Sequence, residues 1–175
     1  MSHLTRRATP LVAMIVGSAS LALAAAPAGA KTTTPAHAKT TTLHFFQKQT
    51  SQVVIGPGGK AIAPPSATNP PVVGEEFIST DDDYVGNHTH HAKTATASDH
   101  LVCTLTTVTG QATCDGEIAI GGSMLLAENV PLDLTKLPIV PLNGGTGIYK
   151  HAHGTASTVT VGTTNNSDFT VKFTT

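Results

Sequence analysis

Apolar and polar residues alternate in short stretches along the chain after Leu43, and no segment keeps apolar residues at helical spacing over several turns. The pattern is clearest from Phe169 to Thr174, where apolar and polar side chains occupy every other position. Successive side chains of a strand point to opposite faces, so this segment is predicted to be a strand with one buried face.

Similar stretches rich in Thr, Val, Ile and Phe recur between Gly, Pro, Asn and Asp residues, and about eight short strands are typical of a β-barrel or a β-sandwich. Two segments rich in Pro and Gly, Gly56–Pro71 and Pro131–Gly147, are predicted as loops. Either one of them shapes the mouth of a pocket, or they are surface loops. The predicted strands are Leu43–Ile55, Val72–Thr80, Tyr84–Ala97, Leu101–Thr109, Gln111–Ile120, Ser123–Val130, Gly154–Gly162 and Ser167–Thr174.

The composition narrows the class of protein. Charged residues make up 12% of the chain, against roughly 25% in ordinary domains, and the chain has 16 Gly and 11 Pro. These figures exclude an all-α protein, whose exposed helices need Glu and Lys. With 10 basic and 11 acidic residues the net charge is −1, so the chain has no basic patch for nucleic acid, and a nucleic-acid-binding protein is excluded as well.

The N-terminal segment has the pattern of a secretory signal peptide. Arg6 and Arg7 precede an apolar run from Leu11 to Ala26, and small residues follow up to Ala30. The apolar run is shorter than the about 20 residues that cross a bilayer, so no membrane span is expected after cleavage. We therefore predict a secreted protein with a signal peptide at 1–30, a disordered Thr-rich linker at 31–42 and a β-barrel domain at 43–175.

The chain has two cysteines, Cys103 and Cys114, on either side of a short turn that contains Gly110. Counting outward from that turn places the two cysteines opposite each other on paired strands. Exported proteins with an even cysteine count usually pair them, so a disulfide across the hairpin is predicted. The alternative, a metal-thiolate or redox pair, matches no known ligand spacing.

One Gly-rich motif resembles a known family. The run Gly144-Gly145-Thr146-Gly147-Ile148-Tyr149, with Ala152 and Gly154 after it, resembles the Gly-Gly-Thr-Gly signature of the allene oxide cyclase-like and dirigent protein barrels. Gly74-Glu75-Glu76-Phe77 resembles a second segment of the same family. The resemblance spans roughly Leu43 to Thr175. It implies an all-β fold, an eight-stranded antiparallel β-barrel whose interior can hold one small apolar molecule.

The resemblance also implies candidate residues. The plant cyclases of this family use a buried carboxylate in the first strand. The first predicted strand here, Leu43–Ile55, has no Asp or Glu, so the reaction of the plant enzymes is not expected. The acidic residues of dirigent proteins map onto Glu75 and Asp83, which become the candidate catalytic residues. Phe46, Phe77 and Tyr149 are the candidate ligand-binding residues. No cofactor is expected, and the oligomeric state stays open.

Two other clusters have both a functional and a structural interpretation. His88 and His90, and likewise His151 and His153, would share a face in a strand, so the four could bind zinc or copper if the two strands were adjacent. The alternative is a solvated, pH-responsive surface. The run Asp81-Asp82-Asp83 lacks the spaced ligands of a calcium loop and is predicted to be a solvated turn.

The leading hypothesis is therefore a secreted barrel that binds a small apolar ligand. If it is an enzyme, it is an isomerase or cyclase, or a dirigent-type guide of stereochemistry, since such reactions need shape more than strong acids. The first alternative is a non-enzymatic extracellular interaction protein whose barrel is filled by its own side chains. A weaker alternative is a metal-binding protein built on the histidines. Filling of the lumen by the following residues would favour the interaction protein: Phe46, Phe77, Phe169 and Phe173.

Overall fold

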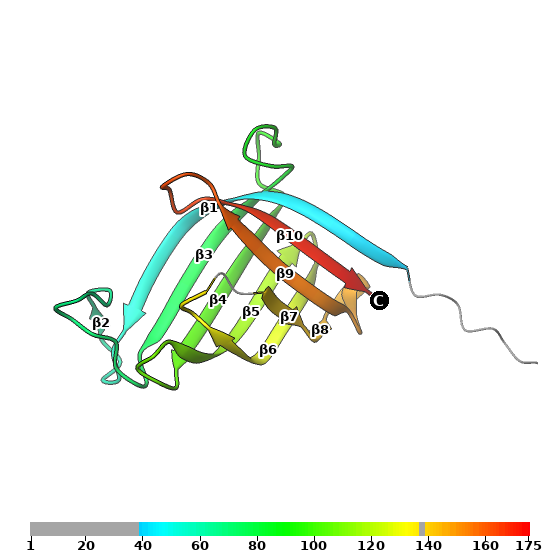
Figure 1. Ribbon diagram of the computed structural model, residues 1–175. Coiled ribbons are helices and arrows are strands. Elements are labelled where there is room, and N and C mark those ends of the chain that lie inside the picture. Colours follow the sequence, from blue (N-terminus) through cyan, green and yellow to red (C-terminus); the bar gives the residue numbers. More distant parts are fainter. Residues whose placement is uncertain (1–38, 137–138) are drawn as a thin grey trace, which may run out of the picture. The chain divides into compact units, whose positions relative to one another are not determined.

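A computed structural model describes residues 39–136 and 139–175, and this part of the chain is an antiparallel β-barrel (Figure 1). The predicted signal peptide, and the predicted linker up to residue 38, lie outside the described residues. The elements are β1 Thr40–Ile55, β2 Ala61–Ile62, β3 Glu76–Val85, β4 Ala97–Leu105, β5 Gln111–Ile120, β6 Ser123–Asp133, β7 Ile139–Leu142, β8 Gly144–Gly145, a short 3-10 helix Gly147–Tyr149, β9 His153–Thr160 and β10 Ser167–Thr174.

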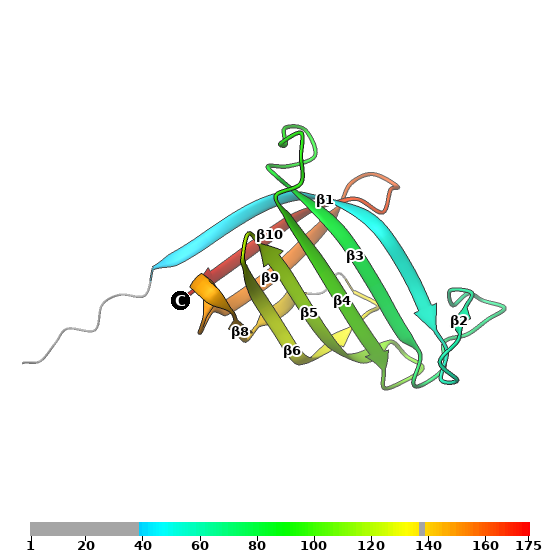
Figure 2. The same cartoon turned by 180° about the vertical axis from the view of Figure 1, so that it is seen from behind.

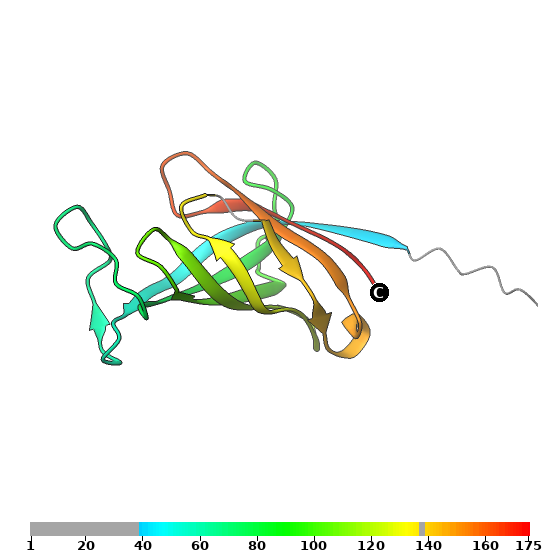
Figure 3. The ribbon, with the colours of Figure 1, turned by 60° about the horizontal axis from the view of Figure 1, so that its bottom comes forward.

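The strands follow the order β7-β9-β10-β1-β3-β4-β5-β6-β8, and β2 forms a small hairpin with the end of β1. Every pair is antiparallel, and Figures 2 and 3 show the sheet curving round so that β6 approaches β7 and β9. The predicted all-β fold, an eight-stranded antiparallel barrel, is confirmed, because β7 and β8 together occupy one strand position.

The barrel closes through residues 139–145, which pair with both edges of the sheet. β7 pairs with β9, and β8 pairs with β6. Between them, the side-chain amide of Asn143 donates to the carbonyl of Glu128 at 2.8 Å and accepts from the Glu128 amide at 2.8 Å. The backbone N–H of Asn143 also donates to Leu126 at 3.0 Å. Asn143 therefore supplies the hydrogen bonds of a strand residue where the strand is interrupted.

Inward positions of the strands form the core. Side chains alternate between the two faces, and residues that are paired across strands share a face. Leu125 of β6 and Val171 of β10 are among the most deeply buried members, each with 0% of its surface exposed. In β1 the register shifts between Gln49 and Ser51, and this bulge brings Val54 opposite Phe77, on the inner face.

The disulfide between Cys103 and Cys114 is present, as predicted. The two residues are directly opposite each other in the β4–β5 ladder, with their Cα atoms 4.0 Å apart. Both side chains are buried on the inner face of the barrel. Within the described part of the chain, no helix has the length and apolar character needed to cross a membrane.

Strands β5 and β10 have the predicted bounds, Gln111–Ile120 and Ser167–Thr174. β1 begins at Thr40 instead of Leu43, because Thr40 to Thr42 pair with the end of β10. Thr has a high strand propensity, and this ladder overrides the low apolar content of the segment.

Two sequence predictions about strands and loops are wrong. Residues 86–96 leave the sheet instead of continuing the predicted strand Tyr84–Ala97, because Gly86 adopts φ +121° and Asn87 accepts hydrogen bonds from the next residues. The predicted loop Pro131–Gly147 contains the end of β6 and all of β7 and β8. Its prolines, Pro131 and Pro141, each pair with one neighbouring strand, where a missing N–H is tolerated.

Candidate functional site

Three aspartates on two neighbouring strands face the lumen of the barrel. Asp81 and Asp83 lie on β3, on either side of the outward-facing Asp82, and Asp99 on β4 is directly opposite Asp81. Asp81 is 6% exposed and Asp83 is 0% exposed. We call Asp81, Asp83 and Asp99 the carboxyl cluster. The prediction that Asp81-Asp82-Asp83 form a solvated turn is wrong, because these residues belong to a strand whose alternate side chains point inward.

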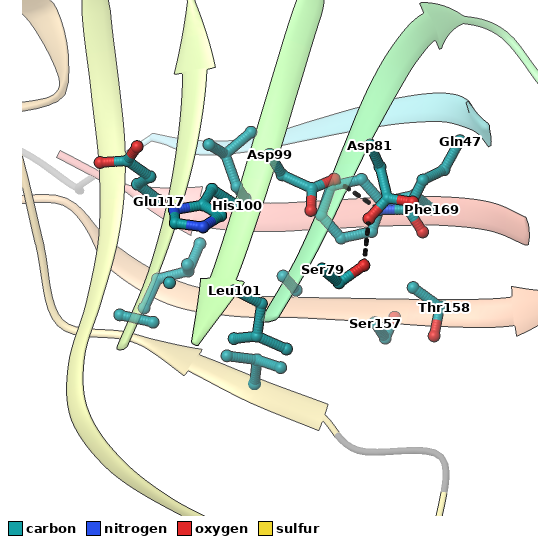
Figure 4. Close-up of a pocket in the computed structure, with 16 residues that line it drawn as sticks. Gln47, Ser79, Asp81, Asp99, His100, Leu101, Glu117, Ser157, Thr158 and Phe169 are labelled. Carbon is teal, nitrogen blue, oxygen red and sulfur yellow. Dashed lines mark hydrogen bonds between the residues drawn. The ribbon is translucent and has the colours of Figure 1, made fainter. Parts of the chain in front are cut away.

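Hydrogen bonds from β1, β3 and β10 orient this cluster. The Gln47 amide donates to Asp99 Oδ2 at 2.5 Å, and Ser167 Oγ donates to Gln47 Oε1 at 2.6 Å. Ser79 Oγ donates to Asp81 Oδ2 at 2.9 Å. Figure 4 shows Gln47, Asp81 and Asp99 converging, with the Gln47–Asp99 and Ser79–Asp81 hydrogen bonds drawn as dashed lines. The cluster is therefore held by neutral donors.

Burial and mutual repulsion change how the cluster holds protons. Burial, followed by the negative charges of Asp83 and Asp81, raises the pKa of Asp99 to about 8, although the hydrogen bond from Gln47 acts against this. Burial and the charge of Asp81 raise the pKa of Asp83 to about 7. Burial also raises the pKa of Asp81, although hydrogen bonds with Ser79 and Asp99 lower it. Asp99 therefore keeps its proton at neutral pH and can donate it.

A cavity of about 180 Å³ borders the cluster, and we call it the carboxyl cavity. Asp81, Asp99, Gln47 and Ser79 form its polar side (Figure 4). Space is left because small residues occupy inward positions on neighbouring strands, at Gly116, Ala127 and Ala156. The remaining wall is mostly apolar and includes Leu101, Ile118, Val140, Leu142 and Phe169.

A second cavity, of about 470 Å³, lies beside the Pro-rich segment between β1 and β3, and we call it the loop cavity. It is lined by Pro64, Pro65 and Pro71 together with inward-facing side chains such as Phe77 and Leu105. Ser79 and Leu101 line both cavities. These two residues are opposite each other in the β3–β4 ladder, so the two cavities are neighbours along the inner face of the same strands.

The predicted catalytic residues lie apart along β3. Asp83 lies near the end of β3 and belongs to the carboxyl cluster. Glu75 comes directly before the first residue of β3 and does not line the carboxyl cavity. Glu75 is 2% exposed, and its Oε2 has no hydrogen-bond partner. Its neighbour Glu76 is only partly buried. Of the two adjacent glutamates, Glu75 is therefore the buried one.

The three predicted ligand-binding residues lie in three different places. Phe77 lines the loop cavity. Tyr149 lies in the short 3-10 helix and packs edge-on against Phe173, with ring centroids 5.4 Å apart. Phe46 is on the outer face of β1, where His91 stacks on it with centroids 4.6 Å apart. The structure therefore does not bring these three side chains together.

The four histidines of the suggested metal site are also separated. His88 binds Asp168, at the start of β10, through its ring at 2.6 Å and its backbone N–H at 2.7 Å. His153 is opposite Thr174, at the other end of β10, and His151 is in the turn before it. His90 is exposed beside His88. Among residues 39–136 and 139–175, no group of His, Cys, Asp or Glu has an arrangement that could hold a metal ion.

Sequence reasoning missed Asp99, Gln47 and Ser79. Asp99 lies in the gap between two predicted strands. Its position opposite Asp81 is determined by the β3–β4 register, which the sequence does not reveal. A weaker signal was present, because Phe77, Ser79, Asp81 and Asp83 alternate at strand spacing. Reading one continuous strand through the aspartates would have placed them all on one face.

The sequence matches no protein-family model and no curated protein. Solved structures do share the fold. A pyocyanin demethylase is similar with a TM-score of 0.54 and 19% identity, over 76% of this chain and 99% of that chain. A pterocarpan synthase dirigent protein is similar with a TM-score of 0.50 and 17% identity, over 84% and 98%. The resemblance to dirigent-like barrels is thus confirmed at the level of the fold.

Proposed function

Starting from a dirigent-like barrel fold, we propose that the lumen binds a small, largely apolar molecule and that Asp99 donates a proton to it, guiding its cyclisation or the stereochemistry of its reaction. The observation that carries the proposal is the carboxyl cluster at the edge of an apolar cavity. A carboxylic acid that stays protonated near neutral pH, such as Asp99 with a pKa of about 8, suits general acid catalysis.

The chemistry needs no added reactant. The Asp99 carboxyl gives its proton to an oxygen of the bound molecule, and the bond that closes the ring or sets the stereocentre forms as charge develops on that oxygen. The resulting carboxylate then takes a proton back from the product, so an isomerisation conserves all atoms. The apolar wall holds the molecule in a reactive conformation, which lowers the entropic part of the barrier. Gln47 positions Asp99 for this exchange through its 2.5 Å hydrogen bond.

The fold comparisons support use of the lumen for a small molecule. The two similar proteins carry names that refer to pyocyanin and to pterocarpan, both of them small molecules. Secretion is part of the same proposal, and the Cys103–Cys114 disulfide supports it, because disulfides persist in oxidising compartments.

A non-enzymatic interaction protein with a filled barrel remains the second candidate. Phe169 and Phe173 face inward and occupy part of the lumen, which favours it, but Phe46 lies outside. The two cavities that remain between these side chains support the ligand-binding function instead.

Fluorescence of the neutral apolar dye N-phenyl-1-naphthylamine tests the proposal, because the dye brightens on leaving water. The wild type should bind the dye. Ala156→Leu, which fills the carboxyl cavity, should weaken binding about tenfold or more by removing apolar contacts. Ala119→Leu, on the outer face of β5, is the matched control and should bind like the wild type. Absence of dye binding, or equal binding by both variants, would overturn the lumen as a ligand site.

Catalysis is tested separately. Candidate unsaturated epoxides, which can isomerise without an added reactant, are incubated with the protein, and chiral chromatography reports the product ratio. Asp99→Asn keeps an acceptor for Gln47 but cannot donate an acidic proton, so it should bind the dye and yet lose the rate or stereochemical effect. If Asp99→Asn kept the full effect, Asp99 would not be the proton donor.

A further inference from the structure

We infer that the lumen selects its ligands by charge and takes an elongated organic cation, with a protonated amine or another cationic nitrogen at the carboxyl cluster and an apolar body that extends into the loop cavity. This inference rests on the proposed function, because it specifies the ligand of the same lumen. Neither the fold nor the Gly-Gly-Thr-Gly motif indicates a cationic ligand.

The carboxyl groups inside the barrel have no basic side chain beside them on the neighbouring strands β1 and β10. Three carboxyl groups meet in the lumen, and the inward positions of β1 beside them are Gln47 and Gln49, which are neutral. β10 contributes the neutral side chains of Ser167 and Phe169. The basic residue next to Gln47 is Lys48, but its ammonium group lies over the Tyr84 ring on the outer face, 4.5 Å from the ring centroid. The carboxyl cluster therefore has no positive partner from β1 or β10.

Two further titratable side chains border the carboxyl cavity, and neither forms an ion pair with the cluster. His100 and Glu117 are opposite each other in the β4–β5 ladder, at positions that alternate with the inward-facing Asp99 and Ile118. Figure 4 shows their side chains beside each other and away from the carboxyl cluster. The potential at the polar side of the cavity is therefore negative whenever any member of the cluster is ionised.

Asp83 supplies an independent observation. Its side chain is 0% exposed, and neither of its carboxyl oxygens has a hydrogen-bond partner. A buried carboxylate without a partner is costly, and a partner of opposite charge removes that cost. No described basic side chain fills this role. Asp83 lines neither cavity, so a cation that the ligand places at Asp81 and Asp99 offsets the charge of Asp83 through space and not by direct contact. An anionic ligand would add a further negative charge to the same desolvated region.

The sizes and linings of the two cavities indicate the shape of the ligand beyond its cationic group. The carboxyl cavity, about 180 Å³, is smaller than the loop cavity, about 470 Å³, and both are lined by Ser79 and Leu101. Phe77, Leu105 and three prolines make the loop cavity apolar. A cationic head at Asp81 and Asp99 with an apolar chain passing Ser79 and Leu101 therefore occupies both.

The pH dependence of binding follows from the same groups. Burial is the main cause that raises the pKa of Asp83 to about 7 and that of Asp99 to about 8. Asp83 and Asp99 also act on each other, because the charge of Asp83 raises the pKa of Asp99 and the side chain of Asp99 lowers that of Asp83. The other groups that act on these values are Asp81, Asp82 from the outer face, and the hydrogen-bonding side chain of Gln47. A bound cation favours ionisation within the cluster, so binding releases protons. Asp83, with a pKa of about 7, ionises before Asp99, with a pKa of about 8, which leaves Asp99 the proton that it donates. The affinity for a cation should therefore rise between pH 6 and pH 9, and the affinity for an anion should fall.

Calorimetry with three probes of equal chain length tests the inference: octylamine, which is a cation at pH 8, neutral octanol, and anionic octanoate. Octylamine should bind most tightly and octanoate most weakly, with about a tenfold or larger difference between the two. Asp99→Asn and Asp81→Asn should each reduce this ratio. Asp82→Asn removes a carboxylate from the outer face of the same strand, where its charge is the smallest contribution to the raised pKa of Asp83, so it should change the ratio much less than either cluster variant. Circular dichroism confirms that each variant is folded.

The outcomes separate this inference from the proposed function. Equal binding of the three probes, or tighter binding of octanoate, would overturn charge selection and leave the lumen as a ligand site. An unchanged ratio in both cluster variants would overturn the role of the carboxyl cluster. Failure of all three probes to bind would contradict the proposed function, and the inference would fall with it.

Discussion

Asp99 has its chemical character because of its partners on other strands. Gln47, Asp81 and Asp83 surround its carboxyl group, and they come from β1 and β3. The sequence could indicate Asp83, because the resemblance to dirigent proteins maps one of their acidic residues onto that position. It could not indicate Asp99, because the strand register brings Asp99 and Asp81 together and no local pattern encodes the register.

The raised pKa values predict an unusual dependence of stability on pH. Asp83 and Asp99 bind their protons more tightly in the folded chain, with pKa values of about 7 and about 8, than in the unfolded chain, where aspartate titrates near 3.9. Ionising them as the pH rises from about 4 to about 8 therefore favours unfolding. The melting temperature should fall between pH 5 and pH 8, by about 3–6 °C for each kcal/mol lost.

Calorimetric melting of Asp99→Asn checks this prediction, because the variant should show a smaller fall and a higher melting temperature than the wild type at pH 8. Asp82→Asn should depart from the wild-type profile much less than Asp99→Asn, because the Asp82 charge is the smallest contribution to the raised pKa of Asp83. Burial tends to raise the pKa of Asp168, but hydrogen bonds from His88 lower it by more, so the net pKa is lowered. The Asp168 carboxyl therefore does not titrate in this window. A melting temperature that stays constant or rises from pH 5 to pH 8 would show that the aspartates ionise normally.

At the scale of elements, the Gly-Gly-Thr-Gly motif acts through backbone contacts at the seam of the barrel. A Cβ atom added to Gly145 would lie 2.3 Å from the Tyr149 carbonyl oxygen and 2.8 Å from that of Met124. A Cβ atom on Gly144 would meet nothing closer than Leu126, at 3.7 Å. The motif therefore lets the chain pack closely between β6 and the short helix.

The two glycines provide a matched pair of variants. Gly145→Ala should lower the free energy of unfolding by about 2 kcal/mol or more, because backbone atoms would have to move. Gly144→Ala should change it by about 0.5 kcal/mol or less. Urea denaturation followed by circular dichroism measures both. Equal effects of the two substitutions would contradict the close approach at Gly145.

The elements also show which sequence signals are dependable. β10 was predicted from end to end, because apolar and polar residues alternate without interruption from Phe169 to Thr174. The segment from 139 to 145 was misread, because Pro141 and two glycines dominate its composition while its strand character comes from pairing with β6 and β9. Tertiary pairing overrides local propensity there.

At the scale of the whole molecule, the barrel explains how a chain with few charges can hold two buried carboxyl groups and a partly buried third one side by side. β3 and β4 contribute the carboxyl groups, β1 and β10 contribute the neutral donors, and β5, β6, β7 and β9 contribute small and apolar residues of the wall. Sequence analysis predicted the barrel and its disulfide. Sequence analysis could not predict where the polar side of the lumen lies. That position depends on the closure of the barrel, which arranges strands that are distant in sequence around one cavity.

The central claim is that a ligand in the lumen touches the carboxyl cluster. Carbon-13 NMR of the aspartate carboxyl signals, recorded before and after saturation with N-phenyl-1-naphthylamine, tests it most directly. The signals of Asp81 and Asp99 should move, while that of Asp133, which is paired with Lys136 on the surface, should not. Unchanged Asp81 and Asp99 signals in the dye-saturated protein would contradict the claim, because the dye would then bind elsewhere.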